Sequence, residues 1–305
     1  MGVVLGLAAG LFFAAFTVLV RIGMRDRAAD DGLLMTILIN TLLLGGVALF
    51  MAWPPFDGPG IAALLIGGVV GTVFGRASSL RAVRRIGPTR TNAFQTGIPV
   101  VSAIAGWLVL DEAVSLGEAV GGILVIAGLL RLVKRSAAVP AGQGQTNAAP
   151  ALAAQTTERR TAVGYLYAAA APVFFGLAFV ARKWGLQQFP GAVIGAFVGS
   201  MAAFVVVTAS DAFGGRLRER VQHNIREIPW PFVWAGVASG AALLSQFTAF
   251  AYVPAWVVGL LQGTQPLWTL GLGYLFLRQE EHIDAQLVTS ILLVVAGVVV
   301  ISIQI

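Results

Sequence analysis

Long apolar runs alternate with short polar connections along the whole chain. Ten of these runs reach or approach the roughly 20 residues that a helix needs to cross the hydrocarbon core of a bilayer. They span residues 2–20, 32–53, 60–80, 88–110, 115–133, 162–182, 189–209, 231–252, 254–277 and 284–304. The pattern therefore predicts an all-α integral membrane protein with ten transmembrane helices.

The composition agrees with this interpretation, because 57% of the 305 residues are hydrophobic and only 11% are charged. Soluble domains carry about 25% charged residues. The net charge of +6 resides mainly in loops, where basic residues report membrane topology, so we expect no nucleic-acid partner. The expected partners are the lipid bilayer and a small-molecule substrate, and the sequence leaves a homodimer open.

Residues 134–161 interrupt the apolar pattern and divide the ten runs into five and five. This segment is rich in Ala, Gln, Thr and Pro, shows no periodicity and is basic at both ends, which is typical of a flexible linker. We therefore predict one five-helix repeat over residues 1–133 and a second over residues 162–305.

The fourth and fifth runs of the two halves share one spaced set of residues. The copies lie 167 residues apart up to a glycine-aromatic pair and 169 apart from a glutamate onward. The first copy is Gln95, Pro99, Gly106, Trp107, Glu112 and Gly128, and the second is Gln262, Pro266, Gly273, Tyr274, Glu281 and Gly297. Such self-similarity predicts two related repeats, and five spans in each require that the second repeat be inverted.

Basic residues are unevenly distributed among the connections. The loops after odd-numbered runs contain nearly all of the loop Lys and Arg, whereas those after even-numbered runs contain only Arg182 and Lys183. The positive-inside rule then places the odd loops, including linker 134–161, in the cytoplasm and both termini outside. We predict a multi-pass protein of a bacterial-type plasma (cell) membrane. The basic segment 213–229 has the spacing of an amphipathic surface helix.

One proline lies near the middle of the fourth run in each repeat. Pro99 and Pro266 cannot donate to the carbonyls of Gln95 and Gln262, so each predicts a helix kink beside a glutamine at mid-membrane depth. If the two polar spots converge at the repeat interface, they form a substrate site of the kind that inverted-repeat transporters build there. Alternatively, each glutamine hydrogen-bonds to a neighbouring helix and only stabilises packing.

Other polar residues within the runs are weaker candidates to line a cavity: Gln246, Gln265, Asn40 and Arg76. Each amide is also explained by an interhelical hydrogen bond. Arg76 is either a cation for an acidic or zwitterionic solute or a side chain that reaches the membrane surface from near a helix end. Two stripes of glycines, at 67, 71 and 75 and at 191, 195 and 199, predict close helix packing.

The sequence shows no arrangement typical of an enzyme. It contains no Cys and only two distant His residues, so we expect no nucleophile-base pair, no metal site and no cofactor. No carboxylate lies in the middle of a predicted span, which argues against proton coupling through a buried acid. We assign Glu112 and Glu281 a structural role at the start of the fifth helix of each repeat, where they face the positive end of its dipole.

The repeated residues from Pro99 through Glu112 to Gly128, and from Pro266 through Glu281 to Gly297, resemble the drug/metabolite transporter superfamily, specifically a protein with two EamA domains. The resemblance implies ten helices around a central cavity and alternating access. The expected function is therefore secondary transport, by export or exchange, of a small polar metabolite. The alternative is a membrane scaffold or regulatory protein that keeps this fold without transport.

Overall fold

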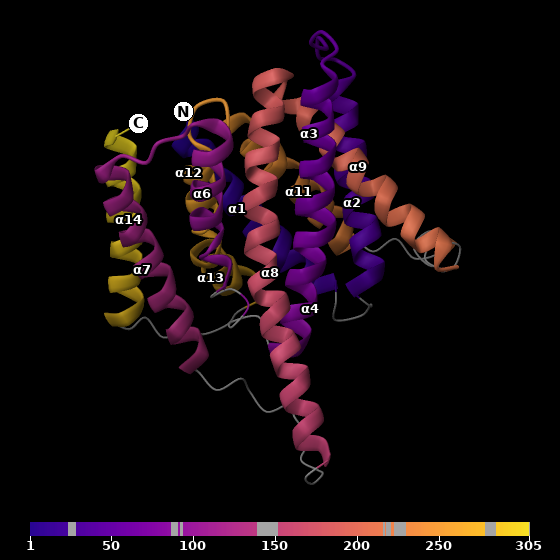
Figure 1. Cartoon of the computed structure of the whole chain (residues 1–305). Coiled ribbons are helices and arrows are strands. Elements are labelled where there is room, and N and C mark those ends of the chain that lie inside the picture. Colours follow the sequence, from indigo (N-terminus) through magenta and orange to yellow (C-terminus); the bar gives the residue numbers. More distant parts are fainter. Residues whose placement is uncertain are drawn as a thin grey trace.

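The fold is that of a computed structural model, which describes residues 1–305 except 24–28, 87–90, 92–93, 139–151, 216, 218–220, 223–229, 278–284 and 305. The described elements are helical (Figure 1). They are α1 (Gly2–Gly23), α2 (Ala29–Ala48), α3 (Gly58–Gly68), the π-helix η1 (Val69–Gly75), α4 (Arg76–Ile86), α6 (Ile98–Leu110), α7 (Leu116–Ala138), α8 (Leu152–Gln188), α9 (Ala192–Phe213), α11 (Trp230–Ala249), α12 (Ala255–Gln262), α13 (Gln265–Leu277) and α14 (Ala285–Gln304).

The lengths and compositions of these helices suit a bilayer. Five segments are long and apolar enough to cross a membrane on their own: Gly2–Val20, Gly58–Ser79, Ala162–Gln188, Ala192–Phe213 and Trp230–Ala249. Shorter apolar helices cover Leu34–Ala48, Ile98–Leu110 and Val288–Gln304, and α7 and the pair α12–α13 occupy the two remaining predicted spans. The predicted all-α integral membrane fold with ten spans is confirmed.

Helix pairing follows the predicted inverted repeat. The second and fifth helices of the two halves contact their equivalents, as α2 with α9 and α7 with α14, while α1 packs on α11 and α3–α4 on α8. The two fourth spans meet through α6 of the first repeat and α12 of the second. Along α7 and α14 the contacts run in opposite directions, because Gly121 lies against Ile301 whereas Gly128 lies against Ser290. Equivalent helices are thus antiparallel, as inversion of the second repeat requires.

The glycine stripes mark places where backbones approach closely. Gly68 of α3 faces Gly199 of α9 so tightly that a Cβ on Gly68 would overlap the Gly199 backbone. The closest approach thus uses Gly68, next to the predicted stripe at 67, 71 and 75, since a helix presents neighbouring residues to different partners. Gly67 and Gly71 instead face α8.

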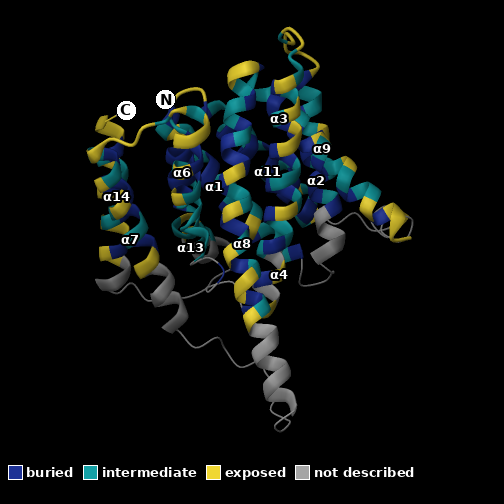
Figure 2. Cartoon of the chain, viewed as in Figure 1, coloured by how far each residue is buried: buried dark blue, intermediate teal, exposed yellow. Residues whose placement is uncertain are grey.

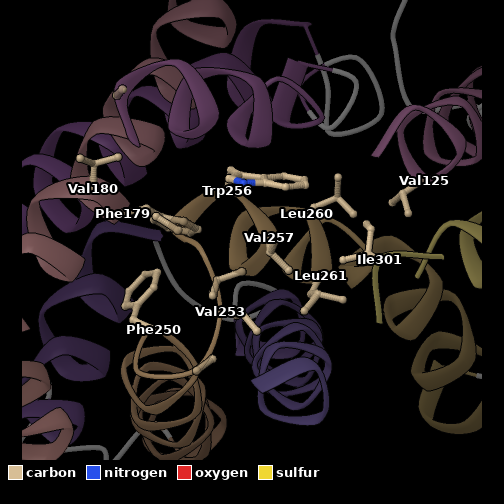
Figure 3. Close-up of a cluster of buried hydrophobic side chains, with 14 of the residues drawn as sticks. Val125, Phe179, Val180, Phe250, Val253, Trp256, Val257, Leu260, Leu261 and Ile301 are labelled. Carbon is tan, nitrogen blue, oxygen red and sulfur yellow. The ribbon is translucent and has the colours of Figure 1, made fainter. Parts of the chain in front are cut away.

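The largest buried cluster surrounds α12 and joins both repeats. Figure 3 shows Val257, Leu260 and Leu261 of α12 between Phe179 of α8 and Ile301 of α14. The outward faces of α6, α7 and α14 are instead exposed (Figure 2), and they carry large apolar side chains such as those of Ile104, Ile123 and Leu292. Exposed apolar surface of this extent is expected where helices face lipid.

The helices extend beyond two of the predicted boundaries. Within the predicted linker 134–161, α7 continues to Ala138 and α8 already begins at Leu152, because most residues of these two ends are Ala, Arg, Lys, Glu, Gln or Leu, which favour helix. The rest of that segment, 139–151, lies outside the described residues. So does most of the predicted surface helix 213–229, although α9 itself reaches Phe213.

Candidate functional site

Both repeats interrupt the helix at the repeated glutamine. In the second, α12 ends at Gln262 and α13 begins at Gln265. In the first, the amide of Gly97 donates to the carbonyl of Phe94 (2.9 Å) just before α6 starts at Ile98. Pro99 and Pro266 each occupy the second position of the new helix, where a backbone N–H has no partner within the helix, so proline costs no hydrogen bond there. The prolines alone predict a kink in a continuous helix, whereas the structure has a break.

Each break packs against the first helix of the other repeat. A Cβ built on Gly10 of α1 would lie 3.3 Å from the carbonyl oxygen of Leu261 and 3.3 Å from Thr264 Oγ1. A Cβ built on Gly97 would lie 3.7 Å from Pro172 Cβ of α8. Gly10 and Pro172 are equivalent positions of α1 and α8, so the two breaks lie in matching places between the repeats.

The glutamine at each break hydrogen-bonds to the third helix of its own repeat. Gln262 Oε1 accepts from Gln246 Nε2 of α11 at 3.2 Å, and Gln95 Nε2 donates to Ser79 Oγ of α4 at 3.1 Å. The two pairs are related by the same 167-residue offset as the breaks. The structure thus brings Gln246 and Gln262 together, in pseudo-symmetry with Ser79 and Gln95.

Arg182 joins this cluster. Its Nη1 donates to Gln246 Oε1 at 3.0 Å, its Nη2 lies 3.4 Å from Thr72 Oγ1, and its Cζ is 5.6 Å from the centre of the Phe247 ring. Only 5% of the residue is exposed. Because Thr72 belongs to the first repeat and the other residues to the second, the cluster bridges the repeat interface.

The hydropathy pattern predicts that the sixth span ends at Arg182 and that this residue belongs to the following loop, and this prediction is wrong. Helix α8 continues to Gln188, so Arg182 lies a turn and a half inside the helix. The hydropathy falls at Arg182 and Lys183 and again at Gln187 and Gln188, so the predicted span ends too early. The sequence does contain a sign that this pair is unusual, because no other basic residue lies in the loops after even-numbered runs.

Small residues on the opposing segment make room for the Arg182 side chain. A Cβ on Gly67 would lie 2.9 Å from Arg182 Cγ, and one on Gly71 would lie 2.7 Å from Arg182 Nη2. Thr72, which contacts the same guanidinium, lies in the π-helical turn η1, and such turns are frequent at functional sites. The predicted packing stripe therefore also forms the surface on which a buried cation rests.

The remaining candidates lie apart from this cluster or at its edge. Arg76 is half-buried, with its Cζ 4.8 Å from the centre of the Phe16 ring. Gln265 Nε2 donates to Thr17 Oγ1 of α1 at 2.9 Å and to the carbonyl oxygen of Phe13 at 3.3 Å, as the packing interpretation predicts for this residue. Asn40 is buried and its Oδ1 faces Gly240.

A second polar network closes the end of the bundle that carries both chain termini (Figure 1). Lys183 Nζ of α8 lies 2.6 Å from Glu112 Oε1 and donates to the carbonyl of Val253 at 2.8 Å. The Glu112 carboxylate also accepts from the amide of Ala255, at 3.0 Å to Oε2, at the first residue of α12. One ion pair thus ties α8, the α6–α7 loop and the α11–α12 loop together.

This network corrects the role predicted for Glu112. The carboxylate stabilises the start of α12, 143 residues away in sequence, and not the start of the following helix α7. There, Glu118 and Ser115 form reciprocal bonds, with Ser115 N 2.8 Å from Glu118 Oε2 and Glu118 N 3.2 Å from Ser115 Oγ, which is a capping box. Glu281 lies outside the described residues.

A cavity of about 400 Å³ lies at the same end, between the α8–α9 and α11–α12 connections. Lys183, Phe247 and Phe250 line it together with residues 186–187, 190–192 and 251–254. Phe250 packs edge-on against Phe247 and Phe179, with ring centres 6.1 and 5.8 Å apart. The Phe247 ring contacts the cavity and also Arg182, so this aromatic group separates the cavity from the buried cluster.

Comparisons with known proteins agree with this architecture. A crystal structure of a protein with 17% sequence identity superimposes with a TM-score of 0.69 over 99% of this chain and 96% of its own, which shows the shared fold. An "uncharacterized transporter" from Haemophilus influenzae (strain ATCC 51907 / DSM 11121 / KW20 / Rd) is 33% identical over 75 residues, a quarter of each chain. The family model of EamA-like transporters matches residues 1–133 and 162–303. The chain therefore belongs to the EamA-like transporter family, with two EamA domains.

Proposed function

We propose that this protein is a secondary transporter that moves a small polar metabolite, by export or exchange, through the region between its two repeats. The observation that carries the proposal is the cluster of Arg182, Gln246, Gln262 and Thr72, in which both repeats contribute buried polar groups beside a helix break. Polar groups within a membrane-spanning bundle are costly unless they are paired or serve a solute.

In this mechanism the two helix breaks are the points at which the helices rotate. Main-chain groups at the end of α12 and at the start of α6 are not held by a continuous helix, so small rotations there change the distance between Gln262 and Gln95. Discontinuous helices at the repeat interface are the usual substrate sites of inverted-repeat transporters. We assign Gln95, Gln246 and Gln262 to solute contact and the helix starts at Pro99 and Pro266 to the hinges.

In this conformation the end that carries the chain termini is closed. The Lys183–Glu112 ion pair and the rings of Phe179, Phe247 and Phe250 stand between the surface and Arg182. Alternating access requires that these contacts part when the solute reaches the cluster from this end. The exposed Arg81 and Arg85 lie at the opposite end of the bundle, which by the positive-inside rule is cytoplasmic in a plasma membrane.

The test begins with the purified protein and a library of amino acids, sugars, nucleotides and cationic drugs. A compound that binds only the folded state raises the apparent melting temperature, and the compound found is then supplied radiolabelled to proteoliposomes. We expect uptake by the parent, a loss of at least tenfold in Gln262→Ala and Gln95→Ala, and parental uptake in Gln188→Ala, an exposed glutamine at the end of α8. Parental uptake in both site variants would overturn the site, and the absence of any uptake would favour the non-transporting scaffold.

A further inference from the structure

We propose that the transported solute is an anion and that Arg182 binds its carboxylate or phosphate group. This inference rests on the proposed transport function and names the chemical class of its substrate. It comes from the balance of charge and of hydrogen-bond donors around Arg182, and neither the fold nor the family match specifies it.

None of the carboxylates that the structure describes neutralises the positive charge of Arg182. Among the residues that the structure describes, no carboxylate forms an ion pair with it, and the nearby acid Glu112 is paired with the adjacent Lys183. Its side-chain partners are the neutral oxygens of Gln246 and Thr72 and the face of Phe247. A buried cation with only neutral partners is costly, and a solute anion would supply the missing charge.

A second cation strengthens the positive field. Arg76 is the first residue of α4 and lies four residues after Thr72, whose hydroxyl contacts the Arg182 guanidinium. It too has an aromatic neighbour, Phe16, and no carboxylate partner among the described side chains. Like charges on neighbouring segments repel each other, and an anion bound at Arg182 offsets that repulsion.

Two N–H donors of the cluster are also left without a partner. Arg182 Nε and Gln262 Nε2 are fully buried and make no hydrogen bond with any described group. Gln246 bonds to both residues, so it holds the guanidinium and the Gln262 amide in one network. A carboxylate or phosphate accepts several N–H bonds at once, and arginine binds it through a planar fork that lysine cannot reproduce.

The experiment measures binding to the full chain in detergent with charged probes, each compared with an uncharged analogue. The pairs are succinate with succinamide and glycerol 3-phosphate with glycerol. We expect at least one anion to raise the melting temperature while its neutral partner does not. Arg182→Gln should weaken that binding at least tenfold, Arg182→Lys should weaken it less because the charge remains, and Arg85→Gln, at the exposed end of α4, should bind as the parent does. The pair that responds tells carboxylate from phosphate recognition.

Several outcomes would overturn the inference. An anion site at Arg182 is contradicted if the neutral partner raises the melting temperature as much as the anion does. It is equally contradicted if Arg182→Gln binds the anion as the parent does, or if no anion raises the melting temperature at millimolar concentration. Uptake assays separate this failure from that of the proposed function. If a neutral solute is transported equally by the parent and by Arg182→Gln, the transport function is supported and the anion site is contradicted. If an anion binds but is not taken up, the anion site is supported and the transport function is contradicted.

Discussion

The Lys183–Glu112 contact allows a quantitative test of how the terminus-bearing end of the bundle is closed. The two side chains are only 13% and 9% exposed. Their interaction should therefore stabilise the protein by more than the roughly 0–1 kcal/mol of a surface ion pair. It should contribute less than the roughly 3–5 kcal/mol that is lost when one partner of a fully buried pair is removed. We expect a coupling energy of about 2 kcal/mol in a double-mutant cycle of Glu112→Ala and Lys183→Met.

The two single variants should differ, because Glu112 makes one more essential contact. Removal of Lys183 leaves the carboxylate bound to the amide of Ala255, where it also faces the positive end of the α12 dipole. Removal of Glu112 takes away that bond as well, which is worth about 1 kcal/mol or more for a charged acceptor. We therefore expect Lys183→Met to cost about 1–2 kcal/mol and Glu112→Ala about 3 kcal/mol, measured as the free energy of unfolding in mixed micelles.

The charge-reversed double variant, Glu112→Lys with Lys183→Glu, distinguishes this network from a simple ion pair. It restores opposite charges but places an ammonium group opposite the Ala255 amide and a carboxylate opposite the Val253 carbonyl. We expect its free energy of unfolding to be lower than that of the parent by at least about 2 kcal/mol. Recovery of parental stability would refute the reasoning, since it would mean that only the attraction between the two charges matters and that the bond to α12 does not.

Three further changes test the packing and the helix ends, each by the same unfolding measurement. Gly68→Ala should destabilise the protein by about 1–3 kcal/mol because its Cβ would overlap the backbone of Gly199. The control is Gly46→Ala, which has no atom within 4 Å of its Cβ and should be neutral or stabilise by up to about 1 kcal/mol. Equal effects of the two substitutions would contradict the contact between Gly68 and Gly199. Ser115→Ala removes one bond of the α7 capping box and should cost about 1 kcal/mol. Asp57→Ala removes the side chain that caps α3 and should cost a similar amount; no loss in either variant would show that the cap contributes nothing.

The spans and their inversion could be predicted because they depend on local hydropathy and on a repeated spacing. Neither requires knowledge of which helices touch. The same spacing located both helix breaks, since Gln95 and Gln262 mark them in each repeat. Their hydrogen-bond partners could not be predicted in the same way, because the bonds from Gln95 to Ser79 and from Gln246 to Gln262 each connect different helices.

The missed parts of the site have a common cause. Hydropathy alone predicts a loop at Arg182, because it counts every arginine as unfavourable in a membrane whatever the neighbouring helices provide. Here Gly67 and Gly71 provide the space and Gln246 the acceptor. The sequence predicts that Glu112 stabilises the helix that follows it, because its actual partner, Ala255, is distant in sequence. Such contacts across the repeats are set by tertiary packing, which a single sequence does not reveal.

In the transport mechanism proposed above, the adjacent residues Arg182 and Lys183 connect closure of the bundle to binding of the solute. Successive residues of an α-helix point about 100° apart, so Lys183 faces the Glu112 network while Arg182 faces Gln246 and Thr72. A movement of α8 that separates Lys183 from Glu112 must therefore also change the position of the Arg182 guanidinium. An anion that binds Arg182 more strongly in one position of α8 than in the other shifts the equilibrium between the closed and open ends by that difference in affinity. Under that proposal, the two charges, one paired and one without a described counter-charge, couple solute binding to the opening of one end through a single helix.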